Sequence, residues 1–296
     1  MESAPAYALA DRLGLTAGRA ALVDLSSSGF GATARLELDD QSLFVKHLPI
    51  SAPDWLLAEA DGLGRLAQTG SVAEAPALRV PRVHGLFEIE DERWLVLEWL
   101  SLQALAPGAA GRLGVELAEH HRRATAGQFG LERDNWIGAT RQINTPIKDW
   151  ATFLFEHRLR VLIDKLVDSG AAFPPDTLDR LREAWIRRFP DYQPVPSLLH
   201  GDLWSGNAAM LANGTPVVYD PAVHYGDREC DLAMAALFGG FGPEFFEAYE
   251  ATWPLESGWE MRREFYQLYH VLNHALLFGG GYLSDARRRI ERLLAG

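Results

Sequence analysis

Cysteine and long apolar runs are scarce in this sequence. Cys230 is the only cysteine among 296 residues, so neither an intramolecular disulfide nor a thiolate-built metal cluster can form. No stretch reaches the ~18 consecutive apolar residues that a membrane span needs. The opening segment, MESAPAYALADRLGL, lacks a basic region followed by an apolar one. We therefore expect a soluble, cytoplasmic protein with no membrane partner.

Positive charge is also scarce. The chain has 28 Lys and Arg against 40 Asp and Glu, a formal net charge of -12. Binding to nucleic acids or anionic membranes depends on attraction to phosphate groups, so neither partner is expected. The arginine-rich segment 287–292 is interrupted by Ile290 and Glu291. This pattern predicts an amphipathic helix with a solvated basic face and not an anion-binding patch.

The first hundred residues predict a strand-rich N-lobe. The length of 296 residues exceeds what one core usually organises, and the chain shows neither internal repeats nor long low-complexity segments. Alternating apolar residues predict strands, and longer periods predict one short and one main helix. The expected strands are Ala20–Leu25, Ala32–Leu38, Ser42–Leu48, Arg82–Ile89 and Trp94–Trp99, and the expected helices are Ala6–Leu13 and Pro53–Gln68. Residues 1–100 are therefore expected to form a five-stranded sheet with one main helix.

Residues 101–296 predict a mainly helical C-lobe, which makes the fold class α+β. The expected helices are Arg112–Ala126, Ile147–Ser169, Asp176–Phe189, Glu229–Phe238, Pro243–Ala251 and Trp259–Phe278. Between them, the segment 198–220 is interrupted by glycines and a proline and has little helical character. We expect the chemistry of the protein in this segment.

The strongest chemical signal is the string LLHGDLWSGN, from Leu198 to Asn207. It is similar to the catalytic loop H-R-D-L-x-x-x-N of protein kinases, and Asp202 and Asn207 have the same spacing as the aspartate and asparagine of that loop. Phosphoryl transfer needs a carboxylate to accept the proton of the attacking hydroxyl, and an oxygen ligand for magnesium nearby. We predict Asp202 as catalytic base and Asn207 as magnesium ligand, in preference to a simple Asx-rich turn.

A second carboxylate, Asp220, follows the apolar run Pro216–Tyr219. Its position after the loop is that of the aspartate in the D-F-G motif of kinases. Magnesium keeps few protein ligands and prefers carboxylates. We therefore predict that Asp220 holds magnesium, although an isolated aspartate at this point would only cap a turn.

Lys46 and Glu59 predict an ion pair in the N-lobe. Alternation along the strand places Lys46 on the face opposite Val45, as in the V-A-I-K motif of kinases. One face of the following helix carries Trp55, Glu59, Leu63 and Leu66. Glu59, unlike Asp61, therefore points inward and needs a partner. We predict that Glu59 pairs with Lys46 and that Lys46 contacts nucleotide phosphates, although an isolated lysine here would be a solvated residue.

The expected cofactors are ATP and Mg²⁺. The segment Ser26–Gly31 offers small residues for a phosphate-covering loop, with Gly29 and Gly31 allowing close backbone approach. A plain glycine hairpin would have a similar composition. Adenine is expected against the backbone of Glu98, Trp99 and Leu100, where the two lobes connect.

Across almost the entire chain, and most densely from residue 198 onward, the sequence resembles the fructosamine kinase (ketosamine 3-kinase) family within the aminoglycoside-phosphotransferase-like kinases. The matching segments are 199–207 (LHGDLWSGN), 225–229 (YGDRE), 231–234 (DLAM), 272–274 (LNH), 278–282 (FGGGY), 129–130 (FG), 135–138 (NWIG), Gln142 and Asn144. Kinases in general lack the Trp-Ser-Gly insert and the terminal glycine run.

The resemblance implies a protein-kinase-like bilobal fold and ATP-dependent phosphorylation of sugar O3 in fructosamines or related ketosamines. The unstable 3-phosphate would then release the amine, which is deglycation repair. The predicted base, metal ligands and lysine–glutamate pair keep their roles. Asp231 resembles the helix aspartate that braces the catalytic loop, although an ordinary carboxylate at a helix N-terminus would also be favourable. His200 is interpreted as structural, because Asp202 already serves as the base.

Three predicted substrate residues are Trp204, His274 and Tyr282. Trp204 either presents an aromatic face to the sugar or fills a buried space beside the loop. His270, Asn273 and His274 share one face of an apolar helix, where they form either a hydrogen-bonded set between helices or a polar wall near the substrate. Both pairs of alternatives stay open.

The glycine-rich loop departs from the family. Many members begin it with a Gly-Gly pair and some carry a cysteine, but this chain has Ser28–Gly31, which excludes cysteine-based redox control of the loop. Two other functions compete: a kinase of the same fold acting on aminoglycosides, choline or another sugar, and a nucleotide-binding pseudokinase. The expected partners are ATP and a free or protein-bound ketosamine, with a monomer as the default.

Overall fold

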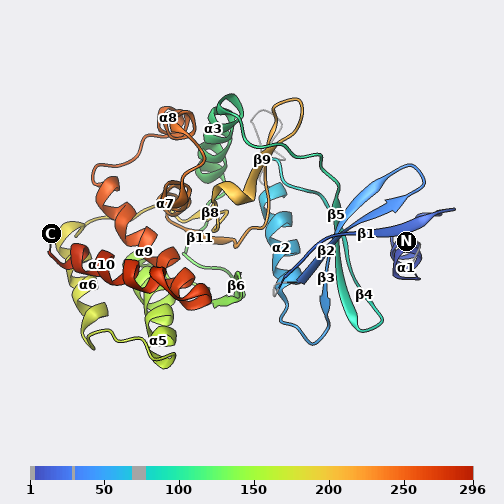
Figure 1. Ribbon diagram of the computed structural model, residues 1–296. Coiled ribbons are helices and arrows are strands. Elements are labelled where there is room, and N and C mark those ends of the chain that lie inside the picture. The colour runs from blue at the N-terminus through green and yellow to red at the C-terminus, as the bar shows by residue number, and fades with distance from the viewer. Residues whose placement is uncertain (1–3, 29–30, 69–77, 296) are drawn as a thin grey trace.

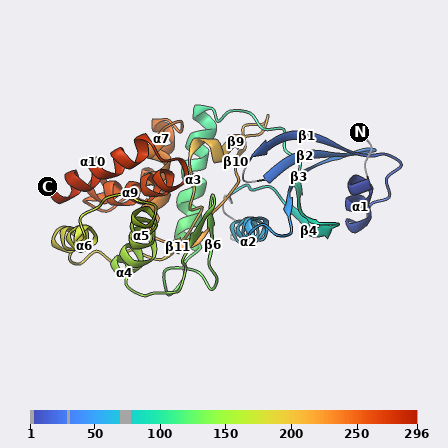
Figure 2. The same cartoon turned by 60° about the horizontal axis from the view of Figure 1, so that its bottom comes forward.

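The protein has two lobes with a helix between them. The computed structural model describes residues 4–28, 31–68 and 78–295. Figure 1 shows a sheet-containing N-lobe on one side, a mainly helical C-lobe on the other, and helix α2 (Trp55–Gln68) between them. The turned view in Figure 2 shows the same order. The bilobal α+β architecture predicted from the sequence is confirmed.

The N-lobe contains the predicted five-stranded sheet. All neighbouring strands are antiparallel, and their order is β1-β2-β3-β5-β4. The strands are β1 (Ala20–Ser28), β2 (Gly31–Leu38), β3 (Ser42–Pro49), β4 (Val83–Ile89) and β5 (Glu92–Glu98). Each begins and ends within a few residues of the expected boundaries. The predicted glycine at position 29 lies outside the described residues.

The two faces of the sheet pack against different helices. Val45 and Val96 are fully buried in a cluster with residues of α1 (Ala4–Arg12). Leu95 and Leu97 point the other way and pack in the cluster that contains the buried leucines of α2. This is the alternation that a strand imposes on successive side chains. It fixes which face of β3 carries Lys46.

The C-lobe is built mainly from helices. They are α3 (Pro107–Arg123), α4 (Trp150–Leu154), the π-helical segment η1 (Phe155–Arg160), α5 (Val161–Asp168), α6 (Thr177–Arg188), α7 (Glu229–Phe238), α8 (Pro243–Thr252), α9 (Trp259–Phe278) and α10 (Gly281–Ala295). The segments α4, η1 and α5 are contiguous and correspond to the helix predicted at 147–169. None of the helices in the described ranges is long and apolar enough to cross a membrane.

Three short strand pairs lie in the described part of the C-lobe and were not predicted individually. They are β6 (Asn135–Ile137) with β7 (Thr140–Gln142), β8 (Ser197–Leu199) with β11 (His224–Gly226), and β9 (Ala208–Met210) with β10 (Pro216–Val218). Each strand has three residues, which is too short for an alternating pattern to be recognised. The catalytic loop runs from β8 to β9 and passes through the short 3₁₀ helix η2 (Ser205–Asn207).

Candidate active site

The catalytic loop lies unusually close to the segment before β11. Gly201 has a φ of +83°, and a Cβ atom at this position would be 2.1 Å from the carbonyl oxygen of Ala222. Only glycine fits, because the left-handed backbone and the contact with a carbonyl both exclude a side chain. The loop is therefore pressed against the chain that follows Asp220, which brings the two halves of the predicted motif together.

His200 connects the same two segments through its ring. Its Nε2 lies 3.0 Å from the carbonyl oxygen of Tyr219, and its Nδ1 lies 3.3 Å from the backbone nitrogen of Asp202. Nε2 must donate to the carbonyl, so Nδ1 accepts from the Asp202 N–H. Burial lowers the pKa of His200 and favours this neutral form. Both ring nitrogens form hydrogen bonds with backbone atoms, which agrees with the interpretation of His200 as a structural residue.

Asp231, near the start of α7, holds the catalytic loop through its backbone. Its carboxylate accepts hydrogen bonds of 2.8 Å from the backbone N–H groups of His200 and Gly201. Nε2 of His121, from α3, lies 3.1 Å away. Burial opposes the charged carboxylate, but these donors outweigh it and lower the pKa of Asp231 to about 2. Asp231 thus lies where the sequence places it, although its partner His121 was not predicted.

Asp202 and Asn207 meet at the mouth of the loop. Nδ2 of Asn207 is 3.0 Å from the backbone oxygen of Asp202 and 3.2 Å from its Oδ2. Burial raises the pKa of Asp202 to about 7, and the negative charge of Asp220 adds to this rise. The carboxylate is therefore poised to take up a proton near neutral pH.

Lys46 bridges two carboxylates from different parts of the chain. Its Nζ is 2.8 Å from Oε1 of Glu59 on α2 and 2.5 Å from Oδ1 of Asp220. Desolvation would lower the pKa of Lys46, but the two carboxylates outweigh it and raise the pKa above its ordinary value. Glu59 is 12% exposed, so it points inward as its helical face predicts, whereas Asp61 pairs with Arg65 on α2 itself.

The chemistry of the donor set fits magnesium. Asp220 offers a carboxylate whose side chain is 46% exposed. Asn207 directs its amide nitrogen at Asp202, so its amide oxygen faces the other way and can act as a ligand. In the described parts of the chain no group of three or more His, Cys, Asp or Glu is arranged for a metal. A two-ligand site suits magnesium, which retains waters and binds substrate phosphates.

A cavity of about 370 Å³ under the sheet fits the predicted nucleotide site. It is lined by residues of both lobes, including Lys46, Asp220 and the predicted connection Glu98, Trp99 and Leu100. The carboxylate of Glu98 is already engaged, because it accepts a 2.6 Å hydrogen bond from Arg79. The Glu98 side chain is thereby held by Arg79, so the backbone groups of this connection are the ones available to the predicted adenine. The predicted Gly31 begins β2 with a φ of +117° and is not among the residues that line this cavity.

A second cavity, of about 390 Å³, has the chemistry of an acceptor site. Its lining includes Asp202, Asn207, Trp204, Asn273 and His274. Lys46 and Asp220 line this cavity and the nucleotide cavity alike, so the two cavities meet at the predicted phosphate and metal residues. A phosphoryl group bound at that junction would lie between the donor and an acceptor hydroxyl.

Trp204 is presented to the acceptor cavity and does not fill a buried space. Its side chain is 39% exposed, and its ring lies over Gly206, where a Cβ would be 2.2 Å from the indole. The neighbouring Ser205 packs against Gly240 in the turn after α7. The Trp-Ser-Gly insert is therefore shaped to hold an aromatic face beside Asp202, which was one of the two alternatives left by the sequence.

The polar residues of α9 divide between the cavity and the interior. Asn273 and His274 line the acceptor cavity, whereas His270 lies deeper, in the C-lobe. Nδ1 of His274 donates to the carbonyl of His270 at 2.8 Å, a bond within the helix. Nδ1 of His270 and Oδ1 of Asn273 have no hydrogen-bond partner among the described residues. The interhelical set is therefore not formed at these two atoms, and Asn273 and His274, but not His270, line the acceptor cavity.

Other residues of the cavity were not assigned from the sequence. Trp55, Trp136 and Phe278 line it, whereas the predicted Tyr282 packs behind, with its ring centroid 5.1 Å from that of His274. Trp136 belongs to the family motif 135–138, so its motif was the available signal. Trp55 was recognised only as part of a buried helical face.

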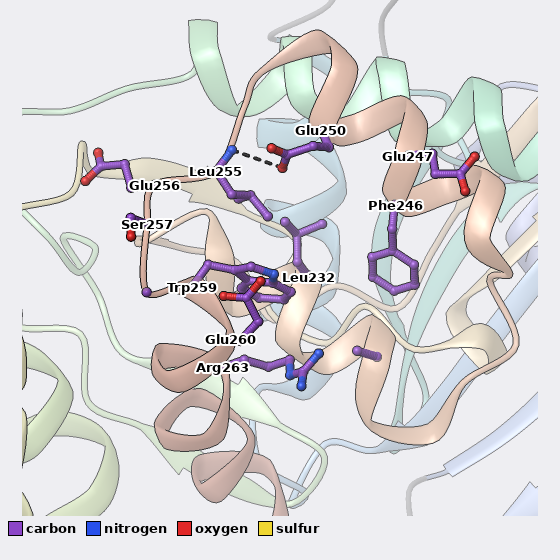
Figure 3. Close-up of a pocket in the computed structure, with 12 residues that line it drawn as sticks. Leu232, Phe246, Glu247, Glu250, Leu255, Glu256, Ser257, Trp259, Glu260 and Arg263 are labelled. Atoms are coloured by element: carbon purple, nitrogen blue, oxygen red, sulfur yellow. Dashed lines mark hydrogen bonds between the residues drawn. The ribbon is translucent and has the colours of Figure 1, made fainter.

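A larger cavity lies elsewhere, between α7, α8 and the start of α9. Its volume is about 660 Å³, and Figure 3 shows Glu247, Glu250 and Glu256 around its rim, with Leu232 and Phe246 toward the middle. Its lining contains none of the residues predicted for catalysis, nucleotide, metal or substrate. Size alone therefore does not identify the candidate active site, because the predicted residues line the two smaller cavities that meet at Lys46 and Asp220.

The fold and the site define a phosphotransferase of the protein-kinase-like class. A solved thermostable mutant of an aminoglycoside phosphotransferase matches the chain with a TM-score of 0.65 at 15% identity, covering 98% of both chains, which shows the shared fold. The family model for fructosamine kinase matches residues 9–296. The chain belongs to the fructosamine kinase family, which confirms the predicted family and an ATP-dependent phosphotransferase.

Two relatives show the extent of the similarity. A protein of Vibrio cholerae assigned as a ketoamine kinase is 41% identical over 237 residues, covering 77% of this chain and 81% of its own length. A solved structure from Thermobifida fusca, assigned as a fructosamine-3-kinase, is 33% identical with a TM-score of 0.84 and covers 100% of both chains. The match therefore extends over both lobes.

Proposed function

We propose that this kinase transfers the γ-phosphoryl group of ATP to O3 of a ketosamine, with Asp202 as the catalytic base. The observation that supports it most is the junction of two cavities at Lys46 and Asp220, with Asp202 in the lining of the acceptor side. A hydroxyl held in the acceptor cavity would face a phosphate held in the other. The substrate class follows from the family and from the relatives named above.

Each residue has a role that its surroundings support. Asp202 would orient the O3 hydroxyl and accept its proton, which its raised pKa favours. Lys46, held by Glu59, would contact phosphate oxygens and neutralise charge that develops during transfer. His200 and Asp231 would hold the loop, since both bind its backbone.

Asp220 and Asn207 would hold magnesium, which supplies charge neutralisation at the phosphates when bound. Adenine would lie in the nucleotide cavity along Glu98–Leu100, and Ser26 of β1 and Thr33 of β2 also line this cavity. The product, a ketosamine 3-phosphate, has a phosphate leaving group next to the ketone carbon. Its loss from the enolised sugar, followed by hydrolysis, would release the amine.

The decisive measurement is analysis of the product formed from a fructosyl-amine and Mg-ATP. We expect phosphorus NMR and mass spectrometry to show a 3-phosphate, followed by timed release of the free amine. An aminoglycoside, choline and a free sugar in parallel reactions test other acceptors of the same fold. A stable phosphate at another position, or phosphorylation of unglycated acceptors only, would refute the ketosamine assignment.

The variant Asp202→Asn tests the assignment of Asp202 as the catalytic base. This variant keeps the shape of the side chain but cannot accept the proton, so turnover should fall on the order of 10²–10⁴-fold. Nucleotide affinity, measured by titration, should stay close to that of the wild type, because the side chain faces the acceptor cavity. Turnover like that of the wild type would show that another group is the base.

A further inference from the structure

A row of exposed aromatic rings extends outward from the catalytic loop. Phe278 is 60% exposed, Phe238 40% and Trp204 39%. The ring centroids of Trp204 and Phe238 are 6.4 Å apart, and those of Phe238 and His274 are 4.9 Å apart. His274 continues the row to Phe278 at 5.5 Å. Large apolar side chains gathered at the surface mark binding sites more often than isolated ones do.

The polar groups beside this row favour a cation. In the described lining of the acceptor cavity, Lys46 pairs with Glu59 and Asp220, so Asp202 is the carboxylate there without a cationic partner. Nδ1 of His274 donates to a backbone carbonyl, which leaves Nε2 as an acceptor in the neutral ring. Burial lowers the pKa of His274 and so favours the uncharged form. A positively charged group near the row would therefore meet aromatic faces and an acceptor nitrogen.

We propose that Phe238, His274 and Phe278 bind the protonated amine of the substrate, so that the enzyme selects ketosamines with a charged nitrogen over neutral analogues. This inference rests on the proposed function. In a ketosamine the nitrogen is four covalent bonds from O3, so a substrate with O3 at Asp202 would keep its amine in or beside the acceptor cavity. The lining of this cavity includes His274 and Phe278, and Phe238 packs against His274. Trp204 follows Asp202 closely in the same loop, and Phe238 is the next ring in the row.

The aromatic rings act through their negative faces, which attract alkylammonium groups. Phe238 ends α7 and Phe278 ends α9, and His274 lies between them. The two phenylalanines would thus contact the substituent carried by the nitrogen, while the sugar stays between Trp204 and Asp202. Substituents with apolar carbon would gain further contact with the same surface.

The test compares two acceptors that differ in charge at nitrogen. One is the fructosyl-amine made from benzylamine, which is protonated at neutral pH, and the other is its N-acetyl derivative, which is neutral. We expect the wild type to have a kcat/KM roughly 2- to 30-fold higher for the protonated acceptor, the range of a cation–π contact. Phe278→Leu and Phe238→Leu keep apolar area but remove the ring, so each should reduce this ratio with the KM for ATP unchanged.

Met261→Ala is the matched control. Met261 is an exposed apolar residue on the first turn of α9, 46% exposed and outside the lining of the acceptor cavity, so this variant should keep the ratio of the wild type. An unchanged ratio in the double variant Phe238→Leu/Phe278→Leu, with unaltered thermal unfolding, would overturn the amine site. Equal use of both acceptors by the wild type would do the same while leaving the proposed function intact. If neither acceptor is phosphorylated, the proposed function itself fails.

Discussion

At the scale of the residue, Asp220 combines a strained backbone with the carboxylate that we propose holds magnesium. Its φ is +56°, in the left-handed region that residues with a side chain seldom adopt. Aspartate and asparagine tolerate this conformation better than other such residues, whereas alanine adds about 1–2 kcal/mol of strain. The backbone and the carboxylate at this position can therefore be tested separately.

We predict that Asp220→Asn loses magnesium-dependent ATP binding but keeps the stability of the wild type better than Asp220→Ala does. The asparagine can retain the left-handed backbone and a bond to Lys46, but it lacks the charge that magnesium prefers. Titrations of ATP with and without magnesium, together with thermal unfolding of both variants, check this. An Asp220→Asn protein whose ATP affinity still responds to magnesium would remove Asp220 from the metal site.

The grouping of the residues proposed for phosphate and magnesium was predictable from the sequence. Asp202, Asn207 and Asp220 lie in one short segment with fixed spacing, and Glu59 was recognised from its helical face. The acceptor side was less accessible to prediction, because Trp136 and Phe238 come from distant elements and carry no catalytic chemistry of their own. Their exposure and their contacts arise only when the helices pack.

At the scale of the element, the catalytic loop depends on α7 and α3 for its shape. Asp231 on α7 accepts hydrogen bonds from two backbone N–H groups of the loop and lies beside His121 of α3. From the family resemblance we expected Asp231 to support the loop, but not its contact with His121. A histidine in an amphipathic helix gives no sign of which residue it will contact. The π-helical segment η1 was likewise predicted only as part of a longer helix.

We predict a pH-dependent loss of stability in which Asp231 takes part. Its pKa falls from 3.8 to about 2 on folding, so its contribution is present above pH 4 and is lost as the pH falls toward 2. The shift corresponds to roughly 2 kcal/mol at neutral pH. Chemical denaturation of the wild type and Asp231→Asn at pH 6 and pH 3 checks this. The difference between them should shrink at the lower pH, and a constant difference would contradict it.

At the scale of the whole molecule, α2 connects the lobes at several points. Nε1 of Trp136 in the C-lobe donates to Oδ1 of Asp54, just before α2, at 2.7 Å. Arg65 on α2 pairs with Glu132 of the C-lobe. The acceptor cavity is lined from both sides of this contact, by Trp55 and Trp136. The relative position of the lobes therefore shapes the acceptor site directly.

We predict that Asp54→Ala raises the KM for the acceptor roughly 2- to 10-fold, the equivalent of one lost hydrogen bond, with a smaller effect on the KM for ATP. The reason is that Trp136 loses its partner across the lobes. Steady-state kinetics with both substrates checks this. Glu88→Ala is the control, because it removes a 2.9 Å ion pair with Arg93 inside the N-lobe. Equal acceptor KM values in the two variants would argue against a role for the lobe contact.

The contact between Gly201 and Ala222 has a consequence for mutational tolerance. A Cβ at position 201 would lie 2.1 Å from a backbone carbonyl, which cannot rotate away as a side chain can. Every missense change at this codon therefore introduces the same clash, whatever the chemistry of the new residue. In a scan of all single substitutions, position 201 should be as intolerant as Asp202 itself, although Gly201 lines neither the nucleotide cavity nor the acceptor cavity. The contact of Gly201 with a backbone carbonyl thus limits substitution at this position as strictly as catalysis limits it at Asp202.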